Sequence, residues 1–304
     1  MIAAAMLCAL AAQRPVAELK PLVVIHLGKT ADWVAVTGDA VWVGSTGPFA
    51  VHRIDPKTNK LVKSIELPGE PCAGLAAGLK SLWVPLCTAP PSLAKINLKT
   101  GDLVLFKVGP AAEEGGIAVS EDSVWMVTDK DGTLARLGPA GEIEQTVKLP
   151  KGSYNPLYAD GKIWITRAEG AEITRVDAKT GAIEETIKTG PAPRFLAAGE
   201  KAVWTLNQGD GSLTRIESKG TRQIMLGTPG KGGDIAVKAG MVWTTMPKTP
   251  LSCTDAKTAT LRVQWTGPGG DSLGVSDDAI WLTDYHGGTI SRLQLTDALK
   301  HCLP

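Results

Sequence analysis

The chain has 304 residues, of which 43% are hydrophobic and 21% are charged, and its formal net charge is +1. This composition is typical of a globular protein with a large core, and 32 basic against 31 acidic residues argue against a dedicated nucleic-acid-binding protein. Glycine (34) and proline (20) are abundant whereas helical patterns are scarce, so we expect an all-β chain rich in turns.

The N-terminus begins with twelve uncharged, mostly apolar residues, MIAAAMLCALAA. This stretch is too short to span a bilayer and ends in small residues, as the core of a signal peptide does. The basic region that usually begins a signal peptide is missing, and a frayed apolar tail is the alternative. We therefore expect residues 1–12 to be a signal peptide of a secreted or periplasmic protein without a transmembrane segment.

One phrase with a tryptophan, first met as GDAVWVG at 38–44, recurs seven times along the chain. The seven tryptophans lie 38 to 42 residues apart, at Trp42, Trp83, Trp125, Trp164, Trp204, Trp243 and Trp281. Before each one stand a short apolar segment and a two-residue turn, the pattern of a β-hairpin, and two further short strand patterns follow. A period of about 40 residues with four strands is typical of one propeller blade. The sequence thus predicts a seven-bladed β-propeller of four-stranded antiparallel blades, in one domain over 17–304.

The two ends of the chain predict how the ring closes. The last repeat ends at Pro304, before a fourth strand can form, whereas PLVVIHLG at 21–28 resembles a fourth strand and precedes the first repeat. Pairing of this N-terminal strand with the last repeat would complete the seventh blade and remove its open edge.

The residues that recur in every repeat have a structural interpretation. A ring at a fixed place in each second strand can fill the wedge between blades, and seven equivalent rings cannot all face one ligand. A basic residue follows eleven or twelve positions after six of the tryptophans, and we expect it to lie across the blade surface beside acidic neighbours. These positions are Arg53, Lys95, Arg136, Arg175, Arg215 and Arg292, with Thr254 in the sixth repeat.

Four cysteines follow the predicted signal peptide, which itself contains Cys8. An even number suits an oxidising compartment, and no CxxC spacing indicates zinc. If the turn centres on Leu79-Lys80, Cys72 and Cys87 lie directly opposite each other on adjacent strands, close enough for a disulfide. The register does not decide whether Cys253 and Cys302 pair near the ring closure.

The loops before the first strand and after the second strand of each blade share one face, where irregular residues could form a site. Oxygen ligands that could converge there on Mg²⁺ or Ca²⁺ are Glu113, Glu114, Asp234 and Asp271, and solvated loop charges are the simpler alternative. Candidate ligand-binding residues are Tyr154, Asn155, Arg194, Phe195 and Tyr285. Arg194-Phe195 offers a cation and a ring to an anionic or planar ligand, with strand packing as the alternative.

The repeats GDAVWVGSTGPFAVHRIDPKTNKLVKSIELPG and DGKIWITRAEGAEITRVDAKTGAIEETIKTG resemble those of the streptogramin (virginiamycin B) lyase-like and YVTN-type propellers, over nearly the whole mature chain. YNPL at 154–157 resembles the entrance loop of gluconolactonase-like propellers. The lyase resemblance implies lactone opening by elimination, with a magnesium ion and a histidine base beside an acidic partner. Only His286, in DYHGG, lies on a loop of the expected functional face, and no Glu-x-His pair is present.

Two functions fit these sequence features. The first is an exported scaffold that binds a protein, a peptide or a small ligand on its loop-rich face. The alternative is a lyase or lactonase dependent on Mg²⁺ or Ca²⁺, with His286 as the base, because a base must lie within hydrogen-bond reach of its proton. Fold analogy does not choose between them.

Overall fold

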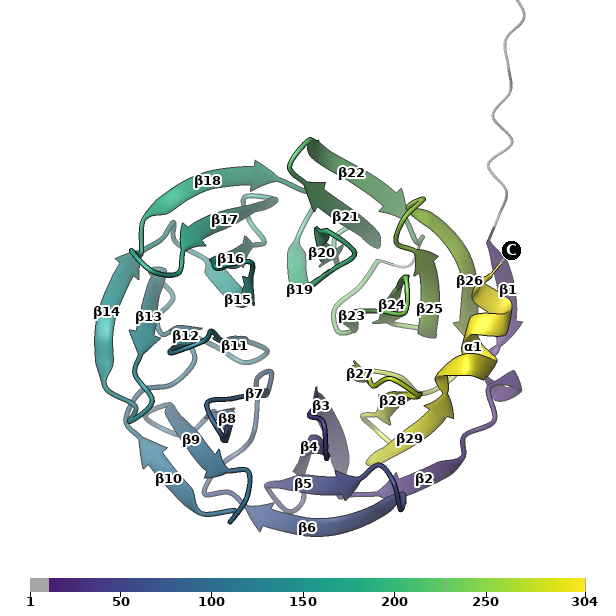
Figure 1. The fold of residues 1–304 in the computed structure, drawn as a ribbon, viewed down its shortest axis with the longest axis horizontal. Helices are drawn as coiled ribbons and strands as arrows, with labels where there is room; N and C mark the ends of the chain where they lie inside the picture. Colours follow the sequence, from purple (N-terminus) through teal and green to yellow (C-terminus); the bar gives the residue numbers. More distant parts are fainter. Residues whose placement is uncertain (1–10, 228, 304) are drawn as a thin grey trace, which may run out of the picture.

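The computed structural model of this protein describes residues 11–227 and 229–303, which form a ring of seven β-sheets around a central axis (Figure 1). Each sheet is a blade whose first strand lies nearest the axis and whose fourth strand lies at the rim. The predicted seven-bladed, all-β propeller is confirmed. Residues 1–10, most of the predicted signal peptide, lie outside the described residues.

The blades follow one another in chain order, each with antiparallel neighbouring strands. Blades one to three are β3 (Thr30–Val36), β4 (Val41–Thr46), β5 (Ala50–Asp55), β6 (Lys60–Glu66); β7 (Ala76–Gly78), β8 (Ser81–Leu86), β9 (Ser92–Asn97), β10 (Leu103–Phe106); β11 (Ile117–Val119), β12 (Val124–Val127), β13 (Thr133–Leu137), β14 (Ile143–Lys148). Blades four and five are β15 (Ser153–Ala159), β16 (Lys162–Arg167), β17 (Glu172–Asp177), β18 (Ile183–Lys188); β19 (Pro193–Gly199), β20 (Ala202–Asn207), β21 (Ser212–Glu217), β22 (Gly220–Met225). Blades six and seven contain β23 (Asp234–Lys238), β24 (Met241–Met246), β25 (Thr249–Asp255), β26 (Thr260–Thr266); β27 (Leu273–Val275), β28 (Ala279–Asp284), β29 (Thr289–Gln294).

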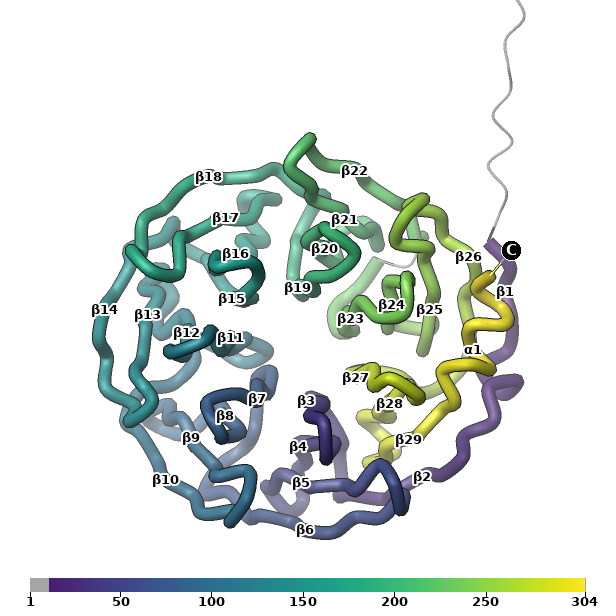
Figure 2. The backbone as a smooth tube through the Cα atoms, in the orientation of Figure 1, coloured from purple at the N-terminus to yellow at the C-terminus, as the bar shows by residue number. Residues whose placement is uncertain are grey.

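The ring closes as predicted, through a strand from the N-terminal segment. β2 (Val23–His26) pairs antiparallel with β29 and completes the seventh blade. Figure 2 shows this purple segment beside the yellow C-terminal strand. Two elements were not predicted: β1 (Ala12–Pro15) adds a parallel fifth strand to β26, and α1 (Leu295–Cys302) follows β29. A 3-10 helix, Val16–Glu18, joins β1 to the chain that leads to β2, and no helix in the described ranges is long and apolar enough to cross a membrane.

The tryptophan of each second strand fills the wedge between blades, as expected. Trp42 packs with Leu82 and Ile96 of the next blade, and Trp281 packs with Val41 across the closure. The basic residues of the third strands stack on these rings with a separation of 5.3 to 5.9 Å, and Arg53 also pairs with Asp39. This cation–π layer covers the outer edge of the wedge in six of the seven blades.

The sixth blade departs from this layer, and the prediction of Thr254 at its basic position was wrong. The residue opposite Trp243 is Cys253, one position earlier. Cys253 forms a disulfide with Cys302 at the end of α1, so the side chain that lies across this ring is tied to the C-terminal helix. The blade thus replaces a cation by a covalent link.

The predicted Cys72–Cys87 disulfide is present, with 5.7 Å between the Cα atoms, but the register that we used for it was wrong. Ala76 faces Trp83 as expected. Further along, however, Pro71 bridges to Leu86, a shift of two residues, because the ladder of β7 ends after three residues. The bridge therefore joins an irregular segment to β8, and it fixes a loop at the functional face.

Candidate functional site

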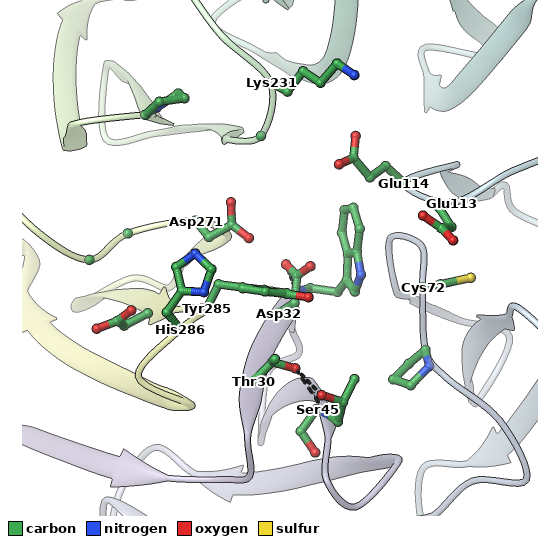
Figure 3. Close-up of a pocket in the computed structure, with 18 of the residues that line it drawn as sticks. Thr30, Asp32, Ser45, Cys72, Glu113, Glu114, Lys231, Asp271, Tyr285 and His286 are labelled. Atoms are coloured by element: carbon green, nitrogen blue, oxygen red, sulfur yellow. Dashed lines mark hydrogen bonds between the residues drawn. The ribbon is translucent and has the colours of Figure 1, made fainter.

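A cavity of about 530 Å³ lies at one end of the ring, on the face formed by the loops before the first strands and after the second strands. We call it the mouth cavity, and Figure 3 shows the side chains around it. Its walls come from blades one, two, three, six and seven, so the predicted grouping of these loops is confirmed. Predicted residues that it brings together are Glu113, Glu114, Asp271, Tyr285 and His286.

A second cavity of about 130 Å³, which we call the throat, shares Trp33 and Glu114 with the mouth cavity. The residue two positions before the partner of each blade's tryptophan stands near the start of the first strand, or just before it, next to the throat. Around the ring this inner position holds Trp33, Gly74, Gly116, Asn155, Phe195, Asp234 and Ser272. All except Ser272 line the throat. The site therefore forms where the repeats differ most.

Asp32 and Asp271 form a hydrogen-bonded carboxyl pair across the junction of the first and last blades. Asp32 Oδ1 accepts hydrogen bonds from Ser272 Oγ at 2.5 Å and from the Trp33 amide at 2.7 Å. Burial, together with the negative charge of Asp271, raises the pKa of Asp32 to about 8. The raised pKa favours the protonated form of Asp32 at neutral pH.

A β-bulge places this pair. The ladder between β3 and β4 shifts between Asp32 and Val34, and Trp33 has a φ of 56°, in the left-handed region that a bulky residue rarely adopts. Trp33 is 9% exposed and contacts Phe195 with 6.3 Å between the ring centroids. Its strained backbone therefore coincides with the cavity wall, as strain often does at functional sites.

Asp234 supplies a third partly buried carboxyl, on the throat side of the cluster. Its oxygens accept the amides of Ile235 at 2.8 Å and Leu273 at 3.0 Å, and burial nevertheless raises its pKa to about 7. The pKa of Asp271 is also raised, because of burial and the charge of Glu114, while His286 acts in the opposite direction. Three aspartates thus surround one small space in which ionisation is costly.

Arg194 connects three other predicted residues. Its guanidinium pairs with Glu114 at 2.8 Å and lies 3.7 Å from the centre of the Tyr154 ring. Its backbone oxygen accepts a hydrogen bond from Asn155 Nδ2 at 2.8 Å. Because this cation already has a carboxylate and a ring as partners, we expect it to hold Glu114 in place rather than to bind an anion.

His286 and Tyr285 lie together in the wall of the mouth cavity, with their rings edge to face and 5.2 Å between centroids. Figure 3 shows His286 and Asp271 on one side of the cavity, Glu113 and Glu114 on the other, and Asp32 between them. The loop residue chosen from the sequence is therefore placed at the cavity, beside an acidic neighbour.

The four predicted metal ligands are divided between the two cavities. Glu113, Glu114 and Asp271 line the mouth, whereas Asp234 lines the throat. Within residues 11–227 and 229–303, no three His, Cys, Asp or Glu side chains are grouped so that they could hold a metal ion. The described carboxylates therefore do not fit a magnesium or calcium ion as they stand, and metal binding by these four residues stays a prediction.

Sequence reasoning missed Asp32 and Trp33. A signal was available, because Trp33 is one of two tryptophans that do not occupy the repeated tryptophan position, and it follows a carboxylate. It was missed because the pattern places a strand at 34–37 and shows neither the bulge before it nor the neighbouring last blade.

Comparison with known proteins shows the fold. No family model matches the sequence, and no curated protein matches it. A streptogramin B lyase structure has a TM-score of 0.75 and 17% identity, covering 90% of this chain and 97% of the other. A catalytically inactive virginiamycin B lyase from Staphylococcus aureus with quinupristin gives 0.74 and 18%, over 90% and 99%. BamB from Moraxella catarrhalis gives 0.63 and 12%, over 91% and 100%. This chain shares the fold of these propellers.

Proposed function

We propose that this chain is an exported propeller that binds a ligand in the mouth cavity and the throat. The observation that carries the proposal is the cluster of Asp32, Asp234 and Asp271, whose pKa values are all raised. Such a cluster lowers the stability of the fold at neutral pH, and residues that do so without a structural need are typical of binding and catalytic sites.

The charge of the cavity indicates what it attracts. Six carboxyl groups line the mouth against two lysines, Lys231 and Lys248. Field lines from like charges concentrate in a recess with low-dielectric walls, so positively charged ligands are drawn to it. The ligand would be a small molecule or an exposed basic segment of a protein.

Export is supported by the two disulfides, which persist in oxidising compartments. The predicted signal peptide over residues 1–12 agrees with this location. A protein partner is compatible with the likeness to BamB, which is a likeness of fold.

The test is a thermal-shift panel of organic ammonium ions, carboxylates, phosphates and neutral sugars. Glu70 is exposed at the edge of the mouth, so Glu70→Trp would fill the cavity without disturbing the core. Glu169→Trp is the matched control, an exposed glutamate on a loop of the same face that does not line either cavity. We expect at least one class to raise the Tm of the wild type and of Glu169→Trp but not of Glu70→Trp. If no class separates the two variants, the cavity is not a binding site.

A second function, lactone opening, rests on His286 beside Asp271 in the mouth cavity. A neutral imidazole there could remove a proton from a substrate carbon while the lactone C–O bond breaks, which leaves an alkene and a carboxylic acid. Incubation with quinupristin tests this directly. Elimination would give a product of unchanged mass that His286→Gln does not form, hydrolysis would add one water, and an intact lactone would remove this candidate.

A further inference from the structure

The throat contains a buried hydrogen-bond acceptor without a donor. Asn155 is 5% exposed, and its Oδ1 has no hydrogen-bond partner among the described residues. The orientation of this amide is determined, because Nδ2 donates to the carbonyl oxygen of Arg194 and a flipped amide would set two oxygens against each other. Oδ1 projects towards Gly116, another throat residue, where a Cβ atom would lie 3.1 Å from it.

The same space is short of positive charge. Asp234 lines the throat, and its carboxyl group lies close enough to Asp32 and Asp271, in the wall of the mouth cavity, to interact with their charges. The nearby cation of Arg194 is paired with Glu114. A buried amide oxygen loses free energy when it lacks a donor, and a buried carboxylate loses free energy when no positive charge balances it. Both would gain from an N–H group that carries a positive charge.

The walls of the throat also select for a compact group. Trp33 and Phe195 present aromatic rings, and Gly74 and Gly116, which add no side chains to the wall, lie beside them. A volume of about 130 Å³ corresponds to roughly four water molecules in the liquid, so it suits an aminoalkyl group and not a large head group. Aromatic rings next to carboxylates are typical surroundings of a bound ammonium ion.

We propose that the throat binds the ammonium group of an organic cation, with Asp234, the Asp32–Asp271 pair and Asn155 Oδ1 as acceptors, while the rest of the ligand lies in the mouth cavity. This inference rests on the proposed function of the mouth cavity and names its ligand class. This proposal explains the unequal inner residues of four blades. Trp33 and Phe195 form an aromatic wall, and Gly74 and Gly116 leave a recess beside it.

Binding of a cation here is coupled to proton release. At low pH the carboxyl pair holds a proton and attracts an ammonium ion less strongly, so affinity increases as the pH rises from 6 to 8.5. Asp234, Glu114 and His286 act on the charges of the pair. The other titratable groups that line the same cavity are Glu70, Glu113, Asp284, Tyr285, Lys231 and Lys248.

The experiment is calorimetric titration of the full chain with 2-phenylethylammonium, its neutral isostere 2-phenylethanol, phenylacetate and Mg²⁺. We expect the ammonium ion to bind at least tenfold more tightly than the alcohol. Asp234→Asn and Asp271→Asn should each weaken it by tenfold or more, and Asn155→Ala by three- to tenfold. Glu169→Gln removes the same charge from the same face outside both cavities, and it should change the affinity by less than twofold.

Stability distinguishes lost binding from lost folding, because Asp271→Asn should keep or raise the Tm while it loses the ligand. Asp234→Asn is compared for binding only, since its side-chain NH2 group would replace one of the two oxygens that accept backbone amides. Equal affinity for the alcohol and the ammonium ion would overturn the inference, as would Mg²⁺ binding that the same substitutions abolish. Suppose that phenylacetate or a sugar binds, that Glu70→Trp blocks this binding, and that the ammonium ion does not bind. The mouth cavity is then a binding site, and only the proposed ligand class is wrong. If nothing is sensitive to Glu70→Trp, both proposals fail.

Discussion

The first and second strands of the seven blades use one repeat in opposite ways. Every second strand carries a tryptophan in the wedge, whereas the inner position of the first strands holds a different residue in nearly every blade. The space between neighbouring blades has the same shape at all seven positions, so the same side chain fills it each time. The inner ring surrounds a single space, and only unequal side chains can give that space a chemistry. Repetition thus marks the fold, and departure from it marks the site.

The largest expected effect is the loss of a wedge ring. Trp125 is fully buried, so Trp125→Ala should lower the free energy of unfolding by about 3–5 kcal/mol. Trp33→Ala should cost less, about 1–2 kcal/mol, because Trp33 borders a cavity and some of its surface already lacks packing. Urea denaturation measures both. Equal costs would contradict the distinction between wedge and inner ring.

Removal of the Cys72–Cys87 disulfide should cause the next largest loss of stability. Cys72→Ala with Cys87→Ala opens a link that spans 15 residues of sequence, which corresponds to about 3 kcal/mol in the chain-entropy description. Because Cys72 also lines the mouth cavity, binding in the cavity should weaken along with stability. Denaturation and ligand titration of the double variant check this, and an unchanged Tm would show that the loop is held by its other contacts.

Substitution in the aspartate cluster should raise the free energy of unfolding instead of lowering it. The pKa of Asp32 is raised from 3.8 to about 8, so the unfolded chain releases this proton at a lower pH than the folded chain does. The protonated carboxyl of Asp32 therefore makes its full contribution to the free energy of unfolding below about pH 4. This contribution is lost as the pH rises towards 8. Asp32→Asn mimics the protonated group, and it should raise the free energy of unfolding at pH 8 by about 1–3 kcal/mol.

This stability gain should disappear near pH 4, where the wild type is itself protonated at Asp32. Thermal melts of both proteins from pH 4 to pH 8.5 would reveal it as converging curves. A gap that is independent of pH would refute the assignment of the proton to Asp32.

The smallest effect should come from the outer edge of the wedge. Arg53 stacks on Trp42 and pairs with Asp39, which is 76% exposed. Arg53→Met keeps much of the apolar contact and removes the charge, so it should cost only about 0.5–1 kcal/mol. Melts at low and high salt separate the two contributions, since only the ion pair is screened strongly. A cost comparable to that of Trp125→Ala would mean that the cation is part of the core.

How far the site could be predicted depended on how each residue breaks the repeat. Asn155, Arg194 and His286 were found because they lie in loops or strand starts that differ from the common pattern. Arg194 was a candidate ligand-binding residue, with strand packing as the alternative. In the structure it pairs with Glu114 and Tyr154, which connects blades three, four and five. Such partners cannot be read from one strand, because they come from loops 40 and 80 residues away.

The sequence by itself determined the number of blades, the closure by the N-terminal strand and the place of the tryptophans, because turns, alternation and period are local properties of the chain. Only the tertiary structure decided the site. It brings Asp32 next to Asp271 across the seam of the ring, and a bulge turns Asp32 and Trp33 towards the axis. The raised pKa values come from burial by other blades, so no residue carries them in its own sequence context.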